Sequence, residues 1–332
     1  MIFKKCKINQ NKERCVFKRD GARMTNQNIV EHKFNTASEL WKAISPERYI
    51  FDIHESTIFR GQGDSNWQLR PSMLREGNHP IESIPEMKSS RRLDKIIYSE
   101  MRYFQSFVQY CDSVGLELPE DSVRFRKEYL NFNSKKSIDM YTSHIQEWPP
   151  YEFYGLMAIA QHYKLPTRLL DWSRRSYVAA YFAAVDALFG QDSQRLAIWV
   201  LDISSKEKMK SLEIIEVPGS NNVNISAQRG ILTLLRQDYN QGESFSGSEC
   251  LDEYVASVQP CSICKLTLPV SEAPKLFHLC GLNSITEATL FPDFYGAARA
   301  TLVDMSRWKK ASNHRGTEIN IRKLKSELPQ EG

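Results

Sequence analysis

The first of three short segments whose composition suggests chemistry carries an arginine suited to anion binding. In Phe59-Arg60-Gly61-Gln62, the arginine ends a β-rich run and directly precedes a glycine. A planar guanidinium can donate in pairs to a phosphate or carboxylate, and a glycine lets a ligand approach the backbone closely. The segment therefore predicts an anion site. A β-turn with an exposed arginine is the structural alternative.

The second segment, Gln161–Ser173, concentrates polar and aromatic residues between two apolar stretches. Sites are often built on loops that a packed scaffold holds in place, so this connector is a candidate site. The alternative is a structural corner in which Arg168 and Asp171 pair and Trp172 packs. The chemically capable members are His162, Tyr163, Thr167, Arg168, Asp171, Trp172 and Ser173.

The third segment, Asn283–Pro292, begins a short apolar run with a carboxylate. Glu287 precedes the run and Pro292 closes it, which predicts a short strand. One glutamate among many acidic residues is no signal by itself. It becomes informative only together with the other two segments.

The cysteines raise the question of a metal site. Seven scattered cysteines, an odd number, indicate a reducing compartment rather than a disulfide framework. Cys261 and Cys264 form a C-x-x-C pair, and His278 and Cys280 follow downstream. However, Cys264 opens an alternating run typical of a strand, whereas His278 and Cys280 fall near the end of a predicted helix. We therefore expect buried thiols acting as small apolar groups and assign no metal ligand, with a structural zinc at Cys261, Cys264, His278 and Cys280 as the alternative.

Composition and charge set the protein class. The chain has 332 residues, 41% of them hydrophobic and 25% charged, which is close to globular averages and excludes collagen-like or disordered chains. The longest apolar run, Tyr177–Leu188, is interrupted by Asp186 and is too short to span a bilayer. No apolar stretch follows the N-terminal charges, so we expect a cytoplasmic protein without membrane association.

The positive charge is concentrated at the N-terminus. Residues 1–23 contain eight basic and two acidic residues, a net charge of +6, so the remainder of the chain carries −2. Any electrostatic affinity for nucleic acid would therefore reside in this arm. A solvated, frayed terminus explains the same charges.

The order of the expected helices and strands predicts an α+β fold with a modest sheet, segregated helices and a helical block at 81–150. Capping-box spacing at Thr36–Glu39 predicts a helix start, and helical periodicity predicts a helix over Arg92–Val114. Between them we expect a strand at Thr57–Phe59, a glycine turn, and extended structure again at Trp67–Leu69. Further helices are expected at 151–163, 177–189, 270–279 and from 293 to about 304, strands at 196–201, 263–268 and 286–291, and loops at 215–226 and 238–250.

The three segments together resemble the FRG domain family, which is named for the triplet that stands here as Phe59-Arg60-Gly61. The likeness covers roughly residues 36–305, between a basic arm at 1–35 and a polar tail at 306–332. Three positions depart from the family pattern: Lys164 stands where a glycine is usual, Tyr177 where a proline is usual, and Phe294-Tyr295 where Leu-Asp is usual. The other matching elements are Gln62, Trp67-x-Leu69-x-Pro71-Ser72, Gln161–Trp172, Ala179–Ala183, Gln228-x-Gly230 and Leu290-Phe291-Pro292-Asp293.

A more distant resemblance is to ADP-ribosyltransferases of the Arg-Ser-Glu type. The order of Arg60, Ser173 and Glu287 is similar, and it implies a split β-sheet core with the helical block inserted and NAD as the substrate. The serine position is only loosely similar, so Thr167 and Ser176 remain rivals for that role. His162 and Tyr163 also raise the His-Tyr-Glu variant.

This resemblance implies roles for individual residues. Glu287 would stabilise the oxocarbenium-like transition state formed when the nicotinamide–ribose bond breaks, Ser173 would orient the ribose, and Arg60 would hold the diphosphate. Tyr163 or Trp172 would stack on nicotinamide. The residues expected to contact NAD are Arg60, Gly61, Gln62, His162, Tyr163, Thr167, Arg168, Asp171 and Trp172.

The family resemblance also implies a biological setting. FRG proteins are similar to components of bacterial toxin–antitoxin and anti-phage defence systems, so we expect a toxin with a neutralising antitoxin, with or without a chaperone. RNA is the acceptor that we favour over protein. The alternatives are an NAD glycohydrolase that depletes NAD, a non-catalytic nucleotide-binding FRG module and, last, a nuclease, for which the sequence offers no acidic cluster at metal-binding spacing.

Overall fold

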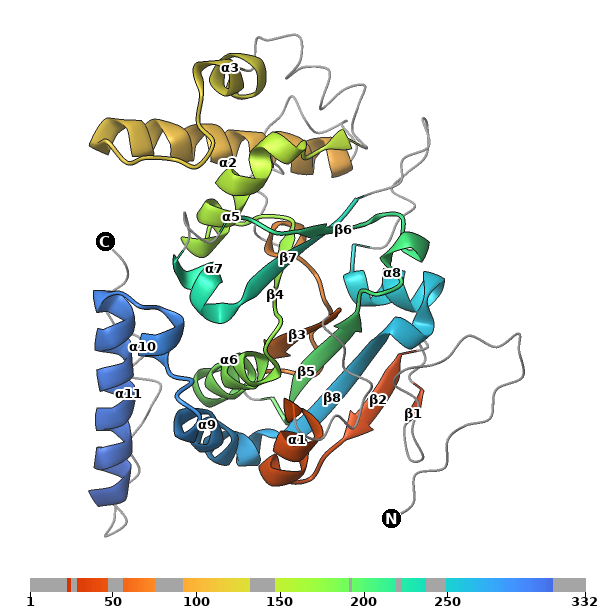
Figure 1. Ribbon diagram of the computed structural model, residues 1–332, viewed down its shortest axis with the longest axis vertical. Helices are drawn as coiled ribbons and strands as arrows, with labels where there is room; N and C mark the ends of the chain where they lie inside the picture. The colour runs from red at the N-terminus through yellow and green to blue at the C-terminus, as the bar shows by residue number, and fades with distance from the viewer. Residues whose placement is uncertain are drawn as a thin grey trace.

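The fold is α+β, as predicted, with helices gathered around one mixed sheet (Figure 1). It is seen in a computed structural model of the chain. The structure describes residues 23–24, 29–46, 56–75, 92–131, 147–190, 193–218, 223–236 and 249–312.

Eight strands form the sheet in the order β1-β2-β8-β5-β3-β4-β7-β6. Neighbouring strands are antiparallel except for the parallel pair β2–β8. The strands are β1 (Arg23–Met24), β2 (Val30–Lys33), β3 (Thr57–Gln62), β4 (Leu169–Ser173), β5 (Arg195–Asp202), β6 (Leu212–Ile215), β7 (Gly230–Leu235) and β8 (Ile263–Pro269).

The sheet is nearly divided between β3 and β4. Strand β3 pairs with β5 along its whole length, from Thr57 to Gln62, but it pairs with β4 only at Phe59 and Ser173. Strand β4 pairs instead with β7 along all of its residues. One group of five strands and one of three therefore meet at a single register position.

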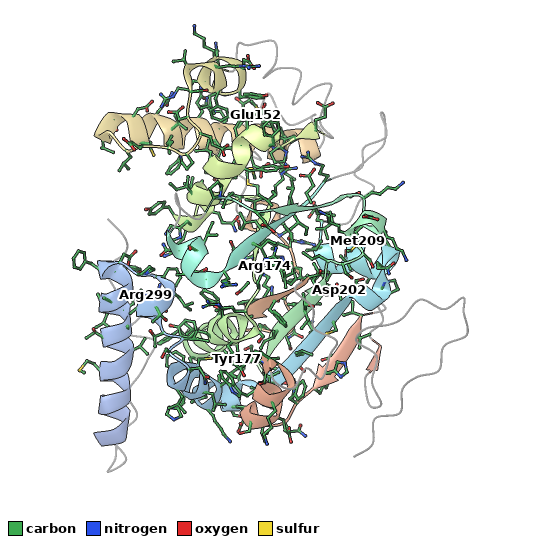
Figure 2. The ribbon with its side chains drawn as sticks, viewed as in Figure 1. Glu152, Arg174, Tyr177, Asp202, Met209 and Arg299 are labelled. Atoms are coloured by element: carbon green, nitrogen blue, oxygen red, sulfur yellow. The ribbon has the colours of Figure 1, made fainter. Side chains whose placement is uncertain are left out.

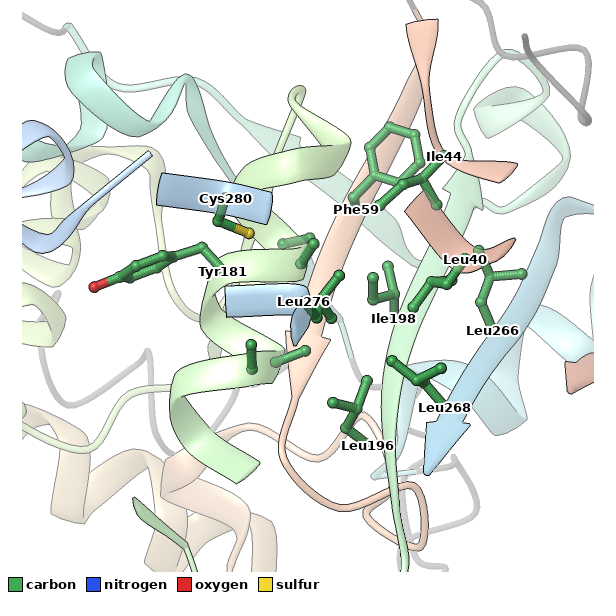
Figure 3. Close-up of a cluster of buried hydrophobic side chains, with 14 of the residues drawn as sticks. Leu40, Ile44, Phe59, Tyr181, Leu196, Ile198, Leu266, Leu268, Leu276 and Cys280 are labelled. Carbon is green, nitrogen blue, oxygen red and sulfur yellow. The ribbon is translucent and has the colours of Figure 1, made fainter. Parts of the chain in front are cut away.

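One face of the larger group is covered by helices α1 (Ala37–Ala43), α6 (Ser176–Phe189) and α9 (Ala273–Leu282). Figure 3 shows the core between them, where Leu40, Ile198 and Leu276 lie among fully buried side chains. Helix α6 is rich in alanine, and five alanines on it belong to this core. Small side chains let the helix axis lie close to the sheet backbone.

The helical block lies at the other end of the molecule, beyond β7 and β6 (Figure 1). Its apolar side chains pack with α5 and β7 around Phe104, Phe153 and Trp148. The described elements of this region are α2 (Arg92–Val114), α3 (Val123–Phe125), the π-helix η5 (Arg126–Leu130), the 3₁₀ turn η7 (Tyr151–Phe153) and α5 (Tyr154–His162).

The remaining helices connect or flank the sheet. Helix α11 lies at one side of the molecule beside α10 (Figure 1). No helix among the described residues is long and apolar enough to cross a membrane. These elements are η2 (Ser72–Leu74), η8 (Lys206–Lys208), α7 (Val223–Gln228), α8 (Leu251–Val258), η10 (Pro260–Ser262), η11 (Val270–Glu272), α10 (Glu287–Leu290) and α11 (Phe294–Ser312).

The structure confirms some predicted elements and corrects others. The capping box at Thr36 and the helix Arg92–Val114 are confirmed. The strand predicted at 286–291 is wrong, because Thr286 caps a short helix there. The loop predicted at 215–226 contains α7, and that predicted at 238–250 lies largely outside the described residues.

The edges of the predicted domain also differ from the structure. Strands β1 and β2 belong to the sheet, so the folded unit begins before residue 36. At the other end, α11 continues to Ser312, past the predicted boundary at residue 305.

Candidate functional site

The residues Arg60, Gly61 and Gln62 lie in strand β3, so the strand predicted at Thr57–Phe59 extends to Gln62 and the predicted turn follows at Asp64–Asn66. Gly61 is required there because α6 presses its backbone onto the strand. A Cβ atom at residue 61 would lie 2.0 Å from the carbonyl oxygen of Ala179 and 2.6 Å from the amide nitrogen of Ala183. Only a glycine fits at this distance, so this contact sets how closely α6 packs on β3.

Arg60 is a largely buried and incompletely paired cation. Its side chain is 17% exposed, and Nη1 donates to the carbonyl oxygen of Asp171 at 2.7 Å. The carboxylate of Asp171 is 3.7 Å away, and Nε has no hydrogen-bond partner.

Burial lowers the pKa of Arg60, and this effect outweighs the opposing influence of the Asp171 carboxylate. The positive charge of Arg75 acts in the same direction as burial, whereas Asp186 adds a further negative charge that opposes it. A buried charge with an unpaired donor is costly, so a bound anion would be stabilised here.

A chain of hydrogen bonds positions Asp171 beside Arg60. Gln161 donates to the Asp171 carboxylate and accepts from the hydroxyl of Thr167. Thr167 is fully buried. The Ser72 hydroxyl donates to its carbonyl oxygen and accepts from its backbone N–H, each at 3.1 Å. The Asp171 side chain itself is 63% exposed, so its carboxylate remains accessible beside the buried guanidinium.

Arg168 anchors the start of β4 to helix α2. Its Nε donates to Glu100 at 2.6 Å and its backbone N–H donates to the same carboxylate at 3.1 Å. Trp148 Nε1 adds a third bond at 2.8 Å. The side chain of Arg168 is 4% exposed and that of Glu100 is fully buried, so this ion pair holds the start of β4 against α2 in the interior. Burial raises the pKa of Glu100, while Arg168 opposes that shift.

Ser173 lies at the register position that joins β3 to β4. Its hydroxyl donates to the carbonyl oxygen of Gln228 at 2.7 Å and accepts from the Arg175 backbone at 2.9 Å. Gln228 in turn donates to the carbonyl oxygen of Leu290 at 3.2 Å. This links the second predicted segment to the third. Ser176, a rival for the serine role, instead donates to the carbonyl oxygen of Ile44.

Glu287 is the first residue of α10 and is buried, with 4% of its side chain exposed. One carboxylate oxygen accepts from the Tyr181 hydroxyl, and the other pairs with Arg299 at 2.9 Å. Arg299 belongs to α11 (Figure 2), and Tyr181 belongs to α6, with its hydroxyl directed away from the buried cluster (Figure 3). The structure therefore shows Glu287 in an ion pair at the α10–α11 junction.

The aromatic residues of the second segment differ in accessibility. Trp172 is buried and donates to Thr233 at 2.9 Å, so stacking on nicotinamide would require it to leave the core. Tyr163 is 56% exposed. His162 accepts from the Asn224 side-chain amide at 2.7 Å, and its ring lies near that of Phe291.

Gln62, also expected to contact NAD, is engaged within the fold. Its side chain is 4% exposed and accepts from Trp199 Nε1 at 2.7 Å. Its amide nitrogen lies 3.4 Å from the carbonyl oxygen of Gln68. Gln62 thus links β3 to Trp199 of β5 and to Gln68, on the face of the sheet opposite α6.

The cysteine group also has a structural setting. Cys264 and Cys280 are fully buried in the core, and His278 is exposed on α9. Burial raises the pKa of Cys280 to about 12, which disfavours the thiolate that a metal requires. Within the described residues, no group of three or more histidine, cysteine or acidic side chains has the geometry to hold a metal ion.

Several residues around the site carry no sequence signal of their own. Glu100 and Trp148 come from the helical block, and Asn224 lies in a stretch predicted as a loop. Phe291 stands in a recognisable Leu-Phe-Pro-Asp motif, but nothing in the sequence indicates that its ring lies beside His162. Only the fold brings these residues together.

Comparison with known protein families identifies an FRG domain, whose family model matches residues 55–191. The match begins at β3 and ends with α6, so it includes Arg60, the segment Gln161–Ser173 and the helical block. The predicted FRG domain is thereby confirmed over this range, and Glu287 lies outside it. No curated protein and no solved structure matches the chain significantly.

Proposed function

We propose that this FRG domain binds NAD at Arg60 and breaks its nicotinamide–ribose bond. One observation carries the proposal: Arg60 is a buried guanidinium with an unpaired Nε, located where the two parts of the sheet meet at one register position. A diphosphate would supply further acceptors for the guanidinium, which Asp171 pairs only incompletely. As part of this proposal, we equate the near division of the sheet with the split sheet of ADP-ribosyltransferases.

The reaction assigned to the site is a substitution at C1′ of the ribose. The bond from C1′ to the nicotinamide nitrogen breaks, and nicotinamide leaves with the electron pair. The oxocarbenium-like centre is then attacked by a nucleophilic oxygen or nitrogen of an acceptor, which loses its proton to a base. Ser173 would orient the ribose near this centre.

Two carboxylates are candidates for stabilising the positive charge. Glu287 is the one that the resemblance nominates, but Tyr181 and Arg299 engage both of its oxygens. Asp171 is favoured by position, because it is exposed and adjacent to Arg60. We assign the stabilising role to Asp171 and a supporting role to Glu287.

The decisive experiment measures NAD affinity and nicotinamide release for wild type and Arg60→Lys. Lysine keeps the charge but loses the guanidinium geometry, so we expect NAD affinity to fall at least about tenfold. Arg124→Lys is the matched control, because that side chain is 80% exposed on the helical block. Equal NAD affinity in the Arg60 variant contradicts the proposal.

The roles of the two carboxylates are separated by Asp171→Asn and Glu287→Gln. Removing one group that stabilises a transition-state charge typically costs about 10²–10³ in rate. We expect this loss in nicotinamide release for Asp171→Asn, with NAD still bound. A comparable loss for Glu287→Gln alone would return the role to Glu287.

A second candidate function is a non-catalytic nucleotide-binding module. The observation that favours it is the burial of Glu287 in its ion pair with Arg299, because a carboxylate held in this way is less able to stabilise a transition state. NAD binding without nicotinamide release selects this alternative. Nicotinamide release without any labelled macromolecule selects an NAD glycohydrolase.

We also propose that the activity serves a toxin within a bacterial toxin–antitoxin or anti-phage defence system. RNA is the acceptor class that we propose, and an antitoxin, with or without a chaperone, would neutralise the toxin. Incubation with labelled NAD and lysate, followed by separate nuclease and protease digestion, identifies the acceptor. Growth arrest on expression of the wild type, and its loss in Arg60→Lys, tests the toxin role.

A further inference from the structure

Helix α11 presents a row of apolar side chains to solvent. Phe294 is 97% exposed, Met305 49% and Leu302 36%. The smaller residues Ala298 and Thr301, which lie between Phe294 and Met305 along the helix, are exposed as well. Exposed apolar side chains that gather on one surface, rather than standing singly, mark an interaction site. The outer face of α11 is therefore a candidate interface.

The spacing of these residues is that of a coiled coil. Positions 294, 298, 301, 305, 308 and 312 of α11 alternate steps of four and three residues. Positions at this spacing form one stripe along a helix, and their side chains insert between those of a second helix. In the sequence this stripe, which we call the heptad stripe, is Phe294, Ala298, Thr301, Met305, Trp308 and Ser312. The heptad stripe predicts that the occupant of this face is another α-helix.

The opposite face of α11 is fixed to the body of the protein. A Cβ atom at Gly296 would lie 1.9 Å from the carbonyl oxygen of Phe291, so the first turn of the helix packs directly on that backbone. Arg299 pairs with Glu287 at 2.9 Å, and Val303 packs against the core. Helix α11 stands at the side of the molecule in Figure 1, held by this inner face. The heptad stripe therefore points away from the body.

We propose that α11 pairs with α11 of a second copy of this chain to form a parallel two-stranded coiled coil. The proposal goes beyond the proposed function and does not depend on NAD. A dimer of this kind has a two-fold axis parallel to the two helices, and the same stripe of each copy meets at the axis. Because the body lies on the face opposite the stripe, the axis places the two bodies on opposite sides of the helix pair.

The charges beside the heptad stripe favour a second copy in the parallel orientation. With 298 and 305 as positions a, and 294 and 301 as positions d, Asp304 stands at position g and Lys309 at position e. In a parallel pair, position g of one helix faces position e of the next heptad in the partner, so the acidic position of each copy meets the basic position of the other. An antiparallel pair matches g with g and e with e, and opposite charges would not meet. The helix is therefore complementary to a copy of itself in one orientation.

Sedimentation equilibrium of the full chain tests the proposal. We expect a monomer–dimer equilibrium with a Kd on the order of micromolar, because one helix pair buries less than a standard interface. Phe294→Glu brings like charges together at the two-fold axis and should weaken the dimer at least about 100-fold. Tyr110→Glu is the matched control, because that ring is 71% exposed on α2, and its dimer should keep the wild-type affinity.

Charge reversal tests the orientation of the two helices. Asp304→Lys and Lys309→Glu each bring like charges together in a parallel dimer, so each variant alone should associate about tenfold more weakly. An equimolar mixture of the two variants pairs opposite charges at both positions and should recover the wild-type affinity. A wild type that is monomeric at about 100 μM overturns the proposal and leaves the face to a helix of another protein. A dimer that Phe294→Glu or the charge variants leave intact also overturns it.

Discussion

At the scale of single residues, each member of the Phe-Arg-Gly triplet has a different role: Phe59 packs in the core, Arg60 can bind an anion, and residue 61 must be glycine because a side chain would not fit there. Phe59 is buried in the core under α6, Arg60 reaches toward Asp171, and Gly61 meets the α6 backbone. The sequence predicts the anion-binding capacity of Arg60 from its chemistry. It does not predict why Gly61 is needed, because that reason lies in a helix more than a hundred residues away.

The Gly61 contact leads to a stability prediction. Gly61→Ala would place a Cβ 2.0 Å from a backbone oxygen, and we expect a loss of about 3 kcal/mol or more in the free energy of unfolding. Denaturant unfolding measures the change. Gly281→Ala is the control, because nothing lies within 4 Å of its Cβ in helix α9, and it should be neutral or stabilising by about 0.5–1 kcal/mol. Equal effects in the two variants would contradict the packing argument.

At the scale of elements, amphipathic and apolar helices were predictable, whereas short strands were not. Strand β4 alternates imperfectly, with only Asp171 exposed, and it lies inside a motif that looked like a connector. Strands β6 and β7 pack against the helical block, and no local sequence pattern predicts this contact. Helix α10 is one turn long, and its Thr286 cap competes with the β-rich run that follows. In each case tertiary packing decides the structure.

The backbone at the end of α5 explains why the family pattern has a glycine where this chain has Lys164. Lys164 follows the helix and has φ +64, in the left-handed region where glycine is favoured. Lys164→Gly should therefore raise the free energy of unfolding by about 0.5–1 kcal/mol. Lys164→Ala keeps the Cβ and should leave stability nearly unchanged. Thermal and denaturant unfolding of the two variants provide the comparison, and a destabilised glycine variant would refute the strain argument.

The contact between α5 and the edge of the sheet predicts a dependence on pH. Burial raises the pKa of Glu213, but hydrogen bonds from Arg236 and Tyr154 outweigh it, so the net pKa is lowered. A lowered folded pKa gives stability that is present above the unfolded value of about 4.3 and is lost as pH falls through the folded value.

Glu213→Gln cannot titrate, so its stability should lack this component. We expect wild type to be more stable than Glu213→Gln at pH 7, with the difference shrinking below about pH 4.3. Denaturant unfolding across this range measures both proteins. A difference that stays constant or grows as the pH falls would show that the carboxylate is not stabilised by its partners.

At the scale of the whole molecule, the helical block is tied to the site by a buried ion pair. Glu100 of α2 accepts three hydrogen bonds, two of them from Arg168 at the start of β4. The family match spans residues 55–191 and therefore encloses this block. Arg168 directly precedes β4, in which Asp171 is the third residue. The ion pair therefore anchors the strand that carries Asp171.

Removing one partner of this pair should cost more than removing both. Glu100→Met leaves Arg168 buried without its carboxylate, and we expect a loss of about 3–5 kcal/mol in the free energy of unfolding. The double variant Glu100→Met with Arg168→Met removes the stranded charge and should recover about 1–2 kcal/mol. Denaturant unfolding of the three proteins measures the difference. Additive losses would show that the buried charge is not the cause.

The single register pair between β3 and β4 has a mechanical consequence. Where two strands share few backbone hydrogen bonds, side chains decide how firmly they are held, and here the guanidinium of Arg60 bridges to the backbone of β4. A ligand that drew the Arg60 side chain away from the Asp171 carbonyl oxygen would remove this bridge, and the Phe59–Ser173 pair would be left as the backbone connection between the two strands.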